Sequence, residues 1–248
     1  MEQVVKAAPD GYTLYLANNA TTLVTPGDLS AAGPDPRRSF IPVTKLANIP
    51  VVIAVSPALG VSTLAELIER ARREPDRLAF ASSGVGSTSH LAASVLFRRA
   101  AVRLLHVPYP GTAFAVKDVL SGEVPIVFTY PATVAGQIRS GHLRALAMTS
   151  ANRTPAFADV PTVAESGYPG FDITTWFGVL VHAGTSPEIV RRLHHELVQV
   201  MALADVRDRL LGIGMQPVGN TPGEFAAELE ADYRHGALLT PDSRKPND

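Results

Sequence analysis

The residues best suited to chemistry form one short stretch, Ser82-Ser83-Gly84-Val85-Gly86-Ser87-Thr88-Ser89-His90, between an expected strand and an expected helix. Its two glycines allow a tight turn that brings backbone N–H groups close to a ligand. The start of a helix leaves N–H donors unpaired and carries a partial positive charge. Serine and threonine hydroxyls add further donors. Together these groups could bind a carboxylate or another anion without the help of an Arg or Lys side chain.

The same pattern also fits a loop that uses glycine only for its turn, since such strand-to-helix turns are common. His90 by itself is more often a packed or capping histidine than a ligand. If the stretch binds an anion, we expect the contacts to come from Ser83, Gly84, Gly86, Ser87, Thr88 and His90.

Other strand ends supply further candidates. Gly111 and Thr112 follow the segment His106-Val107-Pro108-Tyr109 at the end of an expected strand. A rigid turn with Tyr109 packed beside it would explain this segment equally well. Thr129 ends the next strand and Asn18 follows the first, although both also suit ordinary turns. Because open α/β sheets bind ligands beyond the carboxyl ends of parallel strands, we expect the site at that edge.

Catalytic and nucleotide-binding classes fit poorly. Ser89 stands where a dinucleotide-binding loop needs its third glycine, and no Lys follows for a phosphate loop. There is no G-x-S-x-G segment for a serine hydrolase. The absence of Cys excludes disulfides and thiolate metal sites. We therefore expect no enzyme, no catalytic residue, no metal site and no cofactor.

The composition is that of an ordinary globular protein. The 248 residues are 46% hydrophobic and 18% charged, with a net charge of −1. This balance predicts no binding to nucleic acid or to an anionic membrane. No apolar run reaches the roughly 18 residues of a membrane span, and residues 1–6 lack the features of a signal peptide. As written, the chain is expected to stay in the cytoplasm unless its true start lies upstream.

The middle of the chain alternates strand-like and helix-like segments. We expect strands at 51–55, 78–82, 103–107, 124–130 and 143–149, and helices at 63–73, 89–99, 112–120 and 132–139. Beyond this alternating part, after an irregular connection, we expect a strand at 173–181 and helices at 187–201 and 205–211. Thr63 and Glu66 predict a capping box, with Glu66 returning a bond to the Thr63 N–H. The alternation predicts an α/β fold with parallel strands covered by helices on both faces. Near the start we expect a strand at 12–17 and a loop at 25–39. Trp176 is expected to be core.

Short segments spread along the chain match one known family in type and order: Pro9-Asp10-Gly11-Tyr12-Thr13-Leu14, Phe40-Ile41-Pro42-Val43-Thr44, Ser83-Gly84-Val85-Gly86-Ser87 with His90-Leu91-Ala92-Ala93, His106-Val107-Pro108-Tyr109, Asp159-Val160-Pro161-Thr162 and Trp176-Phe177-Gly178. From about residue 2 to about residue 235 the chain resembles the Bug/TctC family, the substrate-binding proteins of tripartite tricarboxylate transporters.

The resemblance implies a type II periplasmic-binding-protein fold with a ligand cleft between two α/β lobes. Lobe one would comprise residues 1–51 and 173–248, and lobe two residues 52–172. It implies a periplasmic, monomeric protein that captures a small carboxylate, such as a dicarboxylate, a tricarboxylate or an acidic amino acid. Its partners would be the membrane subunits of the transporter. A ligand-sensing module of the same fold and a non-functional fragment remain alternatives.

The sequence departs from the family in three places. A signal peptide and further elements, including one ligand loop, normally precede the first residue here. The residues beyond about 235 do not resemble the family. On this reading lobe one is incomplete, and the chain is expected to aggregate or to bind weakly. Pro110 replaces a usual Lys, and Thr129 replaces a frequent Asp, which bears on contacts to a ligand amino group.

Overall fold

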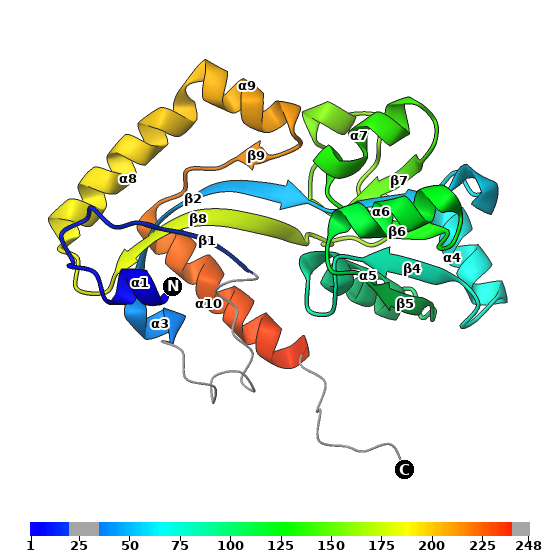
Figure 1. Cartoon of the computed structure of the whole chain (residues 1–248), viewed down its shortest axis with the longest axis horizontal. Helices are drawn as coiled ribbons and strands as arrows, with labels where there is room; N and C mark the ends of the chain where they lie inside the picture. Colours follow the sequence, from blue (N-terminus) through cyan, green and yellow to red (C-terminus); the bar gives the residue numbers. More distant parts are fainter. Residues whose placement is uncertain (20–34, 240–248) are drawn as a thin grey trace, which may run out of the picture. The chain divides into compact units, whose positions relative to one another are not determined.

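The computed structural model describes residues 1–19 and 35–239, with side chains up to Tyr233 (Figure 1). The chain divides into two compact units. Unit 1 gathers residues 1–48, 176–207 and the described residues from 217 onward, whereas unit 2 gathers residues 49–175 and 208–216. Each unit contains its own β-sheet.

The sheet of unit 2 has the strand order β5-β4-β6-β3-β7. Its strands are β3 (Val52–Val55), β4 (Ala79–Ser82), β5 (Leu105–Pro108), β6 (Ile126–Thr129) and β7 (Arg144–Met148). Strand β4 pairs in parallel with β5 and β6, but β3 runs antiparallel to both β6 and β7. The expectation of parallel strands throughout was therefore wrong for β3. A short strand that is buried on both faces is apolar throughout, whether it pairs in parallel or antiparallel. Its hydrophobic pattern therefore does not predict its direction.

Helices cover both faces of this sheet (Figure 1). They are α4 (Leu64–Arg73), α5 (Thr88–Arg99), α6 (Thr112–Ser121) and α7 (Pro131–Arg139), with short 3-10 turns η2 (Pro57–Leu59) and η3 (Pro155–Phe157). Alternate strand residues enter two separate cores, as the pleat requires. Phe80 and Phe128 pack with Leu96 of α5 in one core, and Val127 packs with Val116 of α6 in the other.

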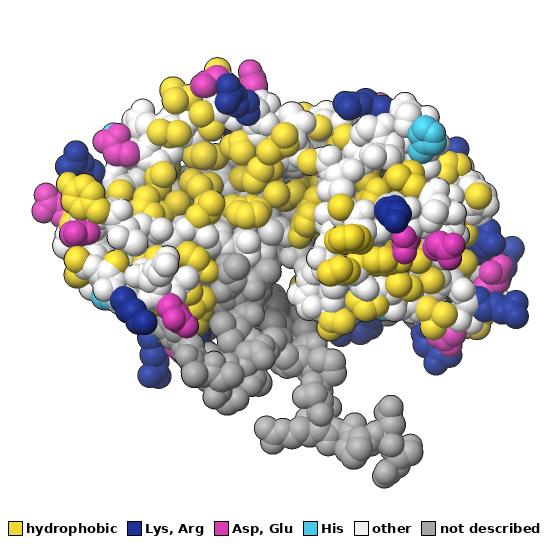
Figure 2. Space-filling view, viewed as in Figure 1, with side chains coloured by type: hydrophobic (Ala, Val, Ile, Leu, Met, Phe, Trp, Pro, Cys, Tyr) yellow, Lys and Arg dark blue, Asp and Glu magenta, His cyan; other side chains and the backbone are white. Residues whose placement is uncertain are grey.

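Local capping chemistry starts helix α4. The Thr63 side chain accepts the Glu66 N–H at 3.2 Å, as predicted. The Glu66 carboxylate accepts the Ser62 N–H at 2.6 Å instead of the Thr63 N–H, so the return bond reaches one residue further back than expected. On its exposed side α4 carries ion pairs such as Arg73 with Glu69, and mixed charges lie along this rim of unit 2 (Figure 2).

Unit 1 is built on a sheet with the order β1-β8-β2-β9. Its strands are β1 (Tyr15–Asn18), β2 (Phe40–Pro50), β8 (Thr174–His182) and β9 (Gln216–Pro217), and its helices are α1 (Glu2–Val5), α3 (Pro36–Ser39), α8 (Pro187–Ala202) and α10 (Pro222–Leu239). Helix α9 (Ala204–Gly212) begins in unit 1 and ends in unit 2. Trp176 is buried among the core residues Phe225 and Leu180, and its ring N–H donates to Asp232 at 2.7 Å. The expectation that Trp176 belongs to the core is therefore confirmed.

The first fifty residues differ most from expectation. Residues 36–39 form helix α3 instead of a loop, because the Asp35 side chain accepts the Arg37 N–H and Pro36 occupies the first helical position. The rest of the expected loop, residues 25–34, lies outside the described residues. Strand β1 begins at Tyr15, three residues later than the pattern predicted. None of the helices described here is both long and apolar enough to span a bilayer.

The buried core of unit 2 gives a stability prediction. Leu67 of α4 is fully buried, whereas Leu120 of α6 is 44% exposed. We expect Leu67→Ala to lower the free energy of unfolding by about 2–5 kcal/mol, because it removes buried methyl groups and leaves a cavity. The matched control Leu120→Ala should change it by less than about 1 kcal/mol. Urea-induced unfolding measures both values, and equal losses would contradict this packing.

Candidate functional site

The loop between β4 and α5 depends on its two glycines. Gly84 and Gly86 have φ angles of +116° and +80°, which side-chain-bearing residues rarely adopt. A Cβ atom on Gly84 would approach the Tyr109 carbonyl oxygen to 3.3 Å, whereas one on Gly86 would meet nothing within 4 Å. The backbone at Gly86 is therefore exposed to open space, where a ligand could approach it.

Serine hydroxyls hold this loop in shape. Ser87 caps helix α5: its hydroxyl accepts the His90 N–H at 3.2 Å and donates to the Gly84 carbonyl at 2.7 Å. The fully buried Ser89 accepts the Ser83 N–H at 3.1 Å, and its oxygen lies 3.0 Å from that of Ser83 and 2.9 Å from that of Ser87. The Ser83 and Ser87 hydroxyls thus stabilise the loop and have only part of their bonding capacity left for a ligand.

Two histidines lie against the same loop. His90 stacks on His106, with ring centroids 4.2 Å apart and an angle of 12° between the planes. His90 Nδ1 accepts the Gly86 N–H at 3.2 Å, so this amide is already bonded within the protein. His106 Nε2 lies 2.7 Å from the Ser82 hydroxyl oxygen. His90 was a predicted ligand contact, and the structure gives it this packing and hydrogen-bonding role.

Burial keeps both imidazoles uncharged near neutral pH. It lowers the pKa of His90, and together with the neighbouring His90 ring it lowers the pKa of His106 to about 4. The residues from Ser83 to His90 therefore offer an anion neutral N–H and O–H donors and the positive end of a helix dipole, with no cationic side chain.

The neighbouring loop after β5 adds a second helix start. Gly111 precedes helix α6, which no side chain caps, and Thr112 is its first residue. Tyr109 packs beside the loop: its hydroxyl donates to Asp118 at 2.8 Å, and burial with this bond raises its pKa to about 12. The Tyr109 N–H donates to the Ser82 carbonyl at 3.1 Å, which ties the two loops together.

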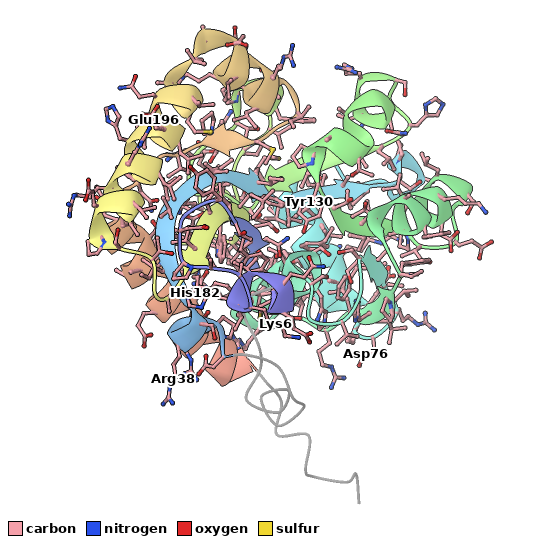
Figure 3. All side chains as sticks on the ribbon, turned by 60° about the vertical axis from the view of Figure 1, so that its left-hand side comes forward. Lys6, Arg38, Asp76, Tyr130, His182 and Glu196 are labelled. Carbon is pink, nitrogen blue, oxygen red and sulfur yellow. The ribbon has the colours of Figure 1, made fainter. Side chains whose placement is uncertain are left out.

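Thr129 ends strand β6 at the same edge of the sheet. It is fully buried, and its hydroxyl oxygen makes no hydrogen bond with any of the described residues. A buried hydroxyl without a partner is costly, so a group that brings one would be favoured there. The following Tyr130 places its hydroxyl 3.0 Å from that of Thr175 (Figure 3).

Nine of the ten predicted contact residues belong to unit 2, and Asn18 belongs to unit 1. The parallel pairing of β4 with β5 and β6 brings the loops after these strands to one edge. Asn18 instead ends β1, opposite Phe177. The supporting residues Ser82, Ser89 and His106 were not among the predicted contacts, although the two serines lie in the stretch that the sequence singled out. The serines adjoin the predicted contacts in the sequence, but no local pattern shows that His106 stacks on His90.

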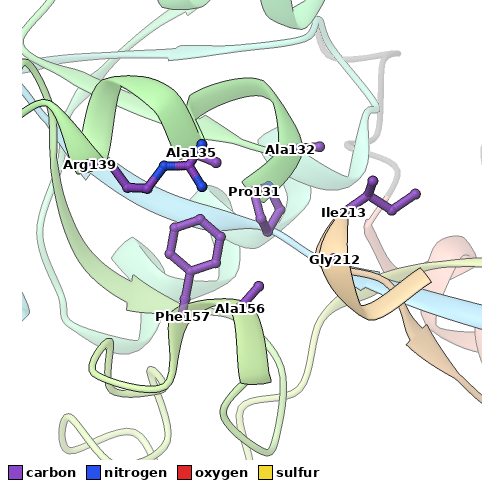
Figure 4. Close-up of a pocket in the computed structure, with 8 residues that line it drawn as sticks. All are labelled: Pro131, Ala132, Ala135, Arg139, Ala156, Phe157, Gly212 and Ile213. Carbon is purple, nitrogen blue, oxygen red and sulfur yellow. The ribbon is translucent and has the colours of Figure 1, made fainter. Parts of the chain in front are cut away.

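A separate small pocket opens beside helix α7, within unit 2 (Figure 4). Its lining is apolar apart from one guanidinium and consists of Pro131, Ala132, Ala135, Arg139, Ala156, Phe157, Gly212 and Ile213. It contains none of the predicted contact residues. Among the residues that the structure describes, no group of three or more metal-ligating side chains comes together.

The chain thus has two units, each with its own β-sheet, and unit 2 presents a glycine-containing loop at its strand ends. Residues 1–234 match the family model described as tripartite tricarboxylate transporter family receptor. The chain belongs to this family, whose members are transporter receptors and not enzymes.

Relatives from several bacteria support the assignment. The chain is 37% identical to a UPF0065 protein from the tcbD-tcbE intergenic region of a Pseudomonas species, covering 91% of this chain and 67% of that protein. It is 33% identical to Protein BugT from Bordetella pertussis, covering 90% of this chain and 69% of the relative. The chain thus spans about two thirds of the length of these relatives.

Solved structures show the fold. A periplasmic transporter matches with a TM-score of 0.82 and 32% identity, covering 98% of this chain and 81% of that one. A protein from R. palustris, solved with adipate, matches with a TM-score of 0.80 and 31% identity, covering 94% and 78%. MatC from Rhodopseudomonas palustris, with bound malate, matches with a TM-score of 0.75 and 27% identity, covering 95% and 81%. The expected two-lobe periplasmic-binding-protein fold is therefore confirmed.

The buried histidines predict how stability depends on pH. Their pKa values are lower in the folded chain than in the unfolded one, so the unfolded chain binds more protons once the pH falls below about 6.5. We expect stability to be lost as the pH falls from about 6.5 through about 4, and this contribution to be constant above 6.5. His106→Phe should reduce the loss, because it keeps a ring in the stack and removes the titrating group.

Urea-induced unfolding at pH 7 and pH 4.5 tests this expectation. Carboxylates also titrate in this range, so the comparison is between variants at each pH. Leu120→Ala, which changes an exposed side chain without an ionisable group, should lose as much stability on acidification as the parent chain. An equal loss in His106→Phe would contradict the prediction.

Proposed function

We propose that this protein is a periplasmic receptor that captures a small carboxylate for the membrane subunits of a tripartite tricarboxylate transporter. Membership of the receptor family supports the transport role, and two structurally similar relatives were solved with the dicarboxylates adipate and malate. In this proposal the protein acts as a monomer. Lobe one comprises residues 1–51 and 173–248, and lobe two comprises residues 52–172.

One observation carries the proposal: the β4–α5 loop offers neutral donors around a backbone that is open at Gly86. A carboxylate accepts several hydrogen bonds at once, and bonds from N–H and O–H groups to an anion are stronger than neutral ones. The α5 dipole adds to this attraction. We assign the remaining bonding capacity of the Ser83 and Ser87 hydroxyls and the first N–H groups of α5, at Thr88, to one ligand carboxylate.

The second loop extends the proposed site. Gly111 and Thr112 stand at the uncapped start of α6, and Tyr109 ties their loop to β4. Thr129 contributes a buried hydroxyl that has no hydrogen-bond partner among the described residues. These groups suit the second carboxylate or a hydroxyl group of the ligand. Asn18 stays a sequence-based prediction for unit 1.

The charges of the two loops narrow the ligand class. Residues 83–90 and 106–112 include no Asp or Glu that could pair with a ligand ammonium group. They include no Lys or Arg either, so the bound anion is neutralised only by dipoles and hydrogen bonds. Within the small carboxylates, we therefore propose that di- and tricarboxylates bind better than acidic amino acids.

A thermal-shift screen tests the ligand class. At 100 times its dissociation constant, a ligand that binds only the folded protein adds about 2.7 kcal/mol to the free energy of unfolding. We expect at least one di- or tricarboxylate to raise the melting temperature. Adipamide, the uncharged counterpart of adipate, is the matched control and should have no effect. No shift with any di- or tricarboxylate or acidic amino acid, in a protein that is folded by circular dichroism, would refute the proposal.

Substitution at Gly86 tests the location of the site. Gly86 and Gly122 both have positive φ angles, +80° and +87°, and a Cβ atom on either would meet nothing within 4 Å. Gly86→Val and Gly122→Val should therefore impose similar backbone strain. Only Gly86→Val places a branched side chain over the proposed site, and we expect it to weaken binding by about tenfold or more.

Calorimetry with a carboxylate identified in the screen gives the comparison, and urea-induced unfolding verifies that the two variants are similarly strained. Equal affinities in the two variants would show that the site does not lie at the β4–α5 loop, without excluding carboxylate binding elsewhere.

A further inference from the structure

Both glycines of the β4–α5 loop are anchored to the same pair of histidines. The Gly86 N–H donates directly to His90 Nδ1 at 3.2 Å. The Gly84 N–H donates to the Ser82 hydroxyl at 3.2 Å, and that hydroxyl in turn bonds with His106 Nε2 at 2.7 Å. The conformation of the loop at its two positive-φ positions therefore depends on the hydrogen-bonding state of two imidazoles.

The pair forms the outer end of an aromatic column that reaches into the core. His106 stacks on His90 on one side and on Phe80 on the other, at 4.2 Å and 4.9 Å between ring centroids. Phe80 in turn contacts Phe97 and Phe128 edge to face. Two imidazolium ions stacked at this separation would repel each other, and one side of the column is apolar. The geometry thus favours two neutral rings.

Strands β4 and β5 and the first turn of helix α5, as the structure describes them, place no acidic side chain beside the pair. Of the elements packed against the pair, β4 has no titratable residue and β5 has only His106. Helix α5 carries His90 in its first turn and Arg98 and Arg99 in its last turn, at the opposite end. Burial is the cause of the lowered His90 pKa, and burial with His90 is the cause for His106. No carboxylate contributes to either shift.

We propose that His90 and His106 are positioning residues that hold the β4–α5 loop in its ligand-binding shape only while both rings are uncharged. The consequence for ligand capture rests on the function proposed above. A neutral His90 accepts the Gly86 N–H at Nδ1. Protonation converts Nδ1 into a donor, so two N–H groups then face each other and the bond is lost. The receptor therefore becomes less able to capture a carboxylate as the pH falls.

Two variants of His90 separate an acceptor role from a packing role. Asn carries an oxygen close to the position of His Nδ1, so His90→Asn keeps an acceptor for the Gly86 N–H and cannot titrate. His90→Leu fills similar space but offers no acceptor. His106→Phe keeps the stack and removes the second titrating ring.

The first measurement uses the ligand-free protein, so it does not depend on the proposed function. In ¹H–¹⁵N NMR spectra recorded from pH 7.5 to pH 4, we expect the Gly84 and Gly86 amide signals to shift together with His90 and His106, with midpoints below 6.5. In His90→Asn the Gly86 signal should stay unchanged through the same range. Glycine signals that do not follow the histidines, or an identical titration of Gly86 in His90→Asn, would overturn the proposal.

The second measurement uses adipate and malate as probes, with affinities from calorimetry at pH 7 and pH 4.5. Loss of one hydrogen bond corresponds to about a fivefold change in affinity. Between these pH values the affinity of the parent chain should fall more than that of His90→Asn, by up to about fivefold, since ligand protonation is common to both. His90→Leu should bind both probes weakly at both pH values. Tighter binding by the parent chain at pH 4.5, as an imidazolium–carboxylate pair would produce, would also overturn the proposal.

Failure of both probes to bind the parent chain at pH 7 would count against the proposed function and leave the NMR result to decide the role of the histidines.

Discussion

Strand β3 sets the arrangement of unit 2, because both its edges are paired and both its faces are buried. All four of its residues are inaccessible to solvent. Val52 pairs with Thr129 on one side and with Met148 on the other, so the start of β3 lies at the carboxyl ends of β6 and β7. Because β4 runs parallel to β5 and β6, the loops that follow these three strands leave the sheet at this same edge. Every predicted contact residue of unit 2 lies on these loops, at the ends of these strands or at the helix starts that follow.

The β4–α5 loop combines a fixed shape with chemically available donors. Its two glycines supply the positive φ angles, and Ser87 and Ser89 bond the loop to the first turn of α5. A loop held in this way has little conformational freedom left to lose when an anion binds, and this favours affinity. In the proposed site the loop groups are neutral, so they would neither repel a second carboxylate nor require an arginine or lysine. The same proposal lets dicarboxylates of different lengths share one anchor.

The neutrality of the site is itself a structural property. His90 and His106 lie beside the loop, and imidazolium ions there would attract anions strongly but would also disturb the bonds to Gly84 and Gly86. Burial instead lowers the pKa values of both rings, and the neighbouring His90 lowers that of His106 further. In the proposed site, neutral rings thus keep the loop geometry near neutral pH but offer a ligand carboxylate no opposite charge. The apolar core of unit 2, by burying these rings, thereby affects the hydrogen bonding of the loop.

Local chemistry in the sequence was sufficient to predict much of this protein. The cap at Thr63, glycine at the tight turns and the alternation of apolar segments depend on residues within a few positions of each other, and the observed elements follow them closely. The direction of β3 could not be predicted, because a strand that is apolar on both faces lacks an asymmetric pattern. Nor could the stacking of His106 on His90, the bond from Gly86 to His90 Nδ1 or the unpaired hydroxyl of Thr129, since these depend on how separate strands and helices pack. The sequence identified the loop and its donors, and only the packed structure showed which donors are already used within the protein.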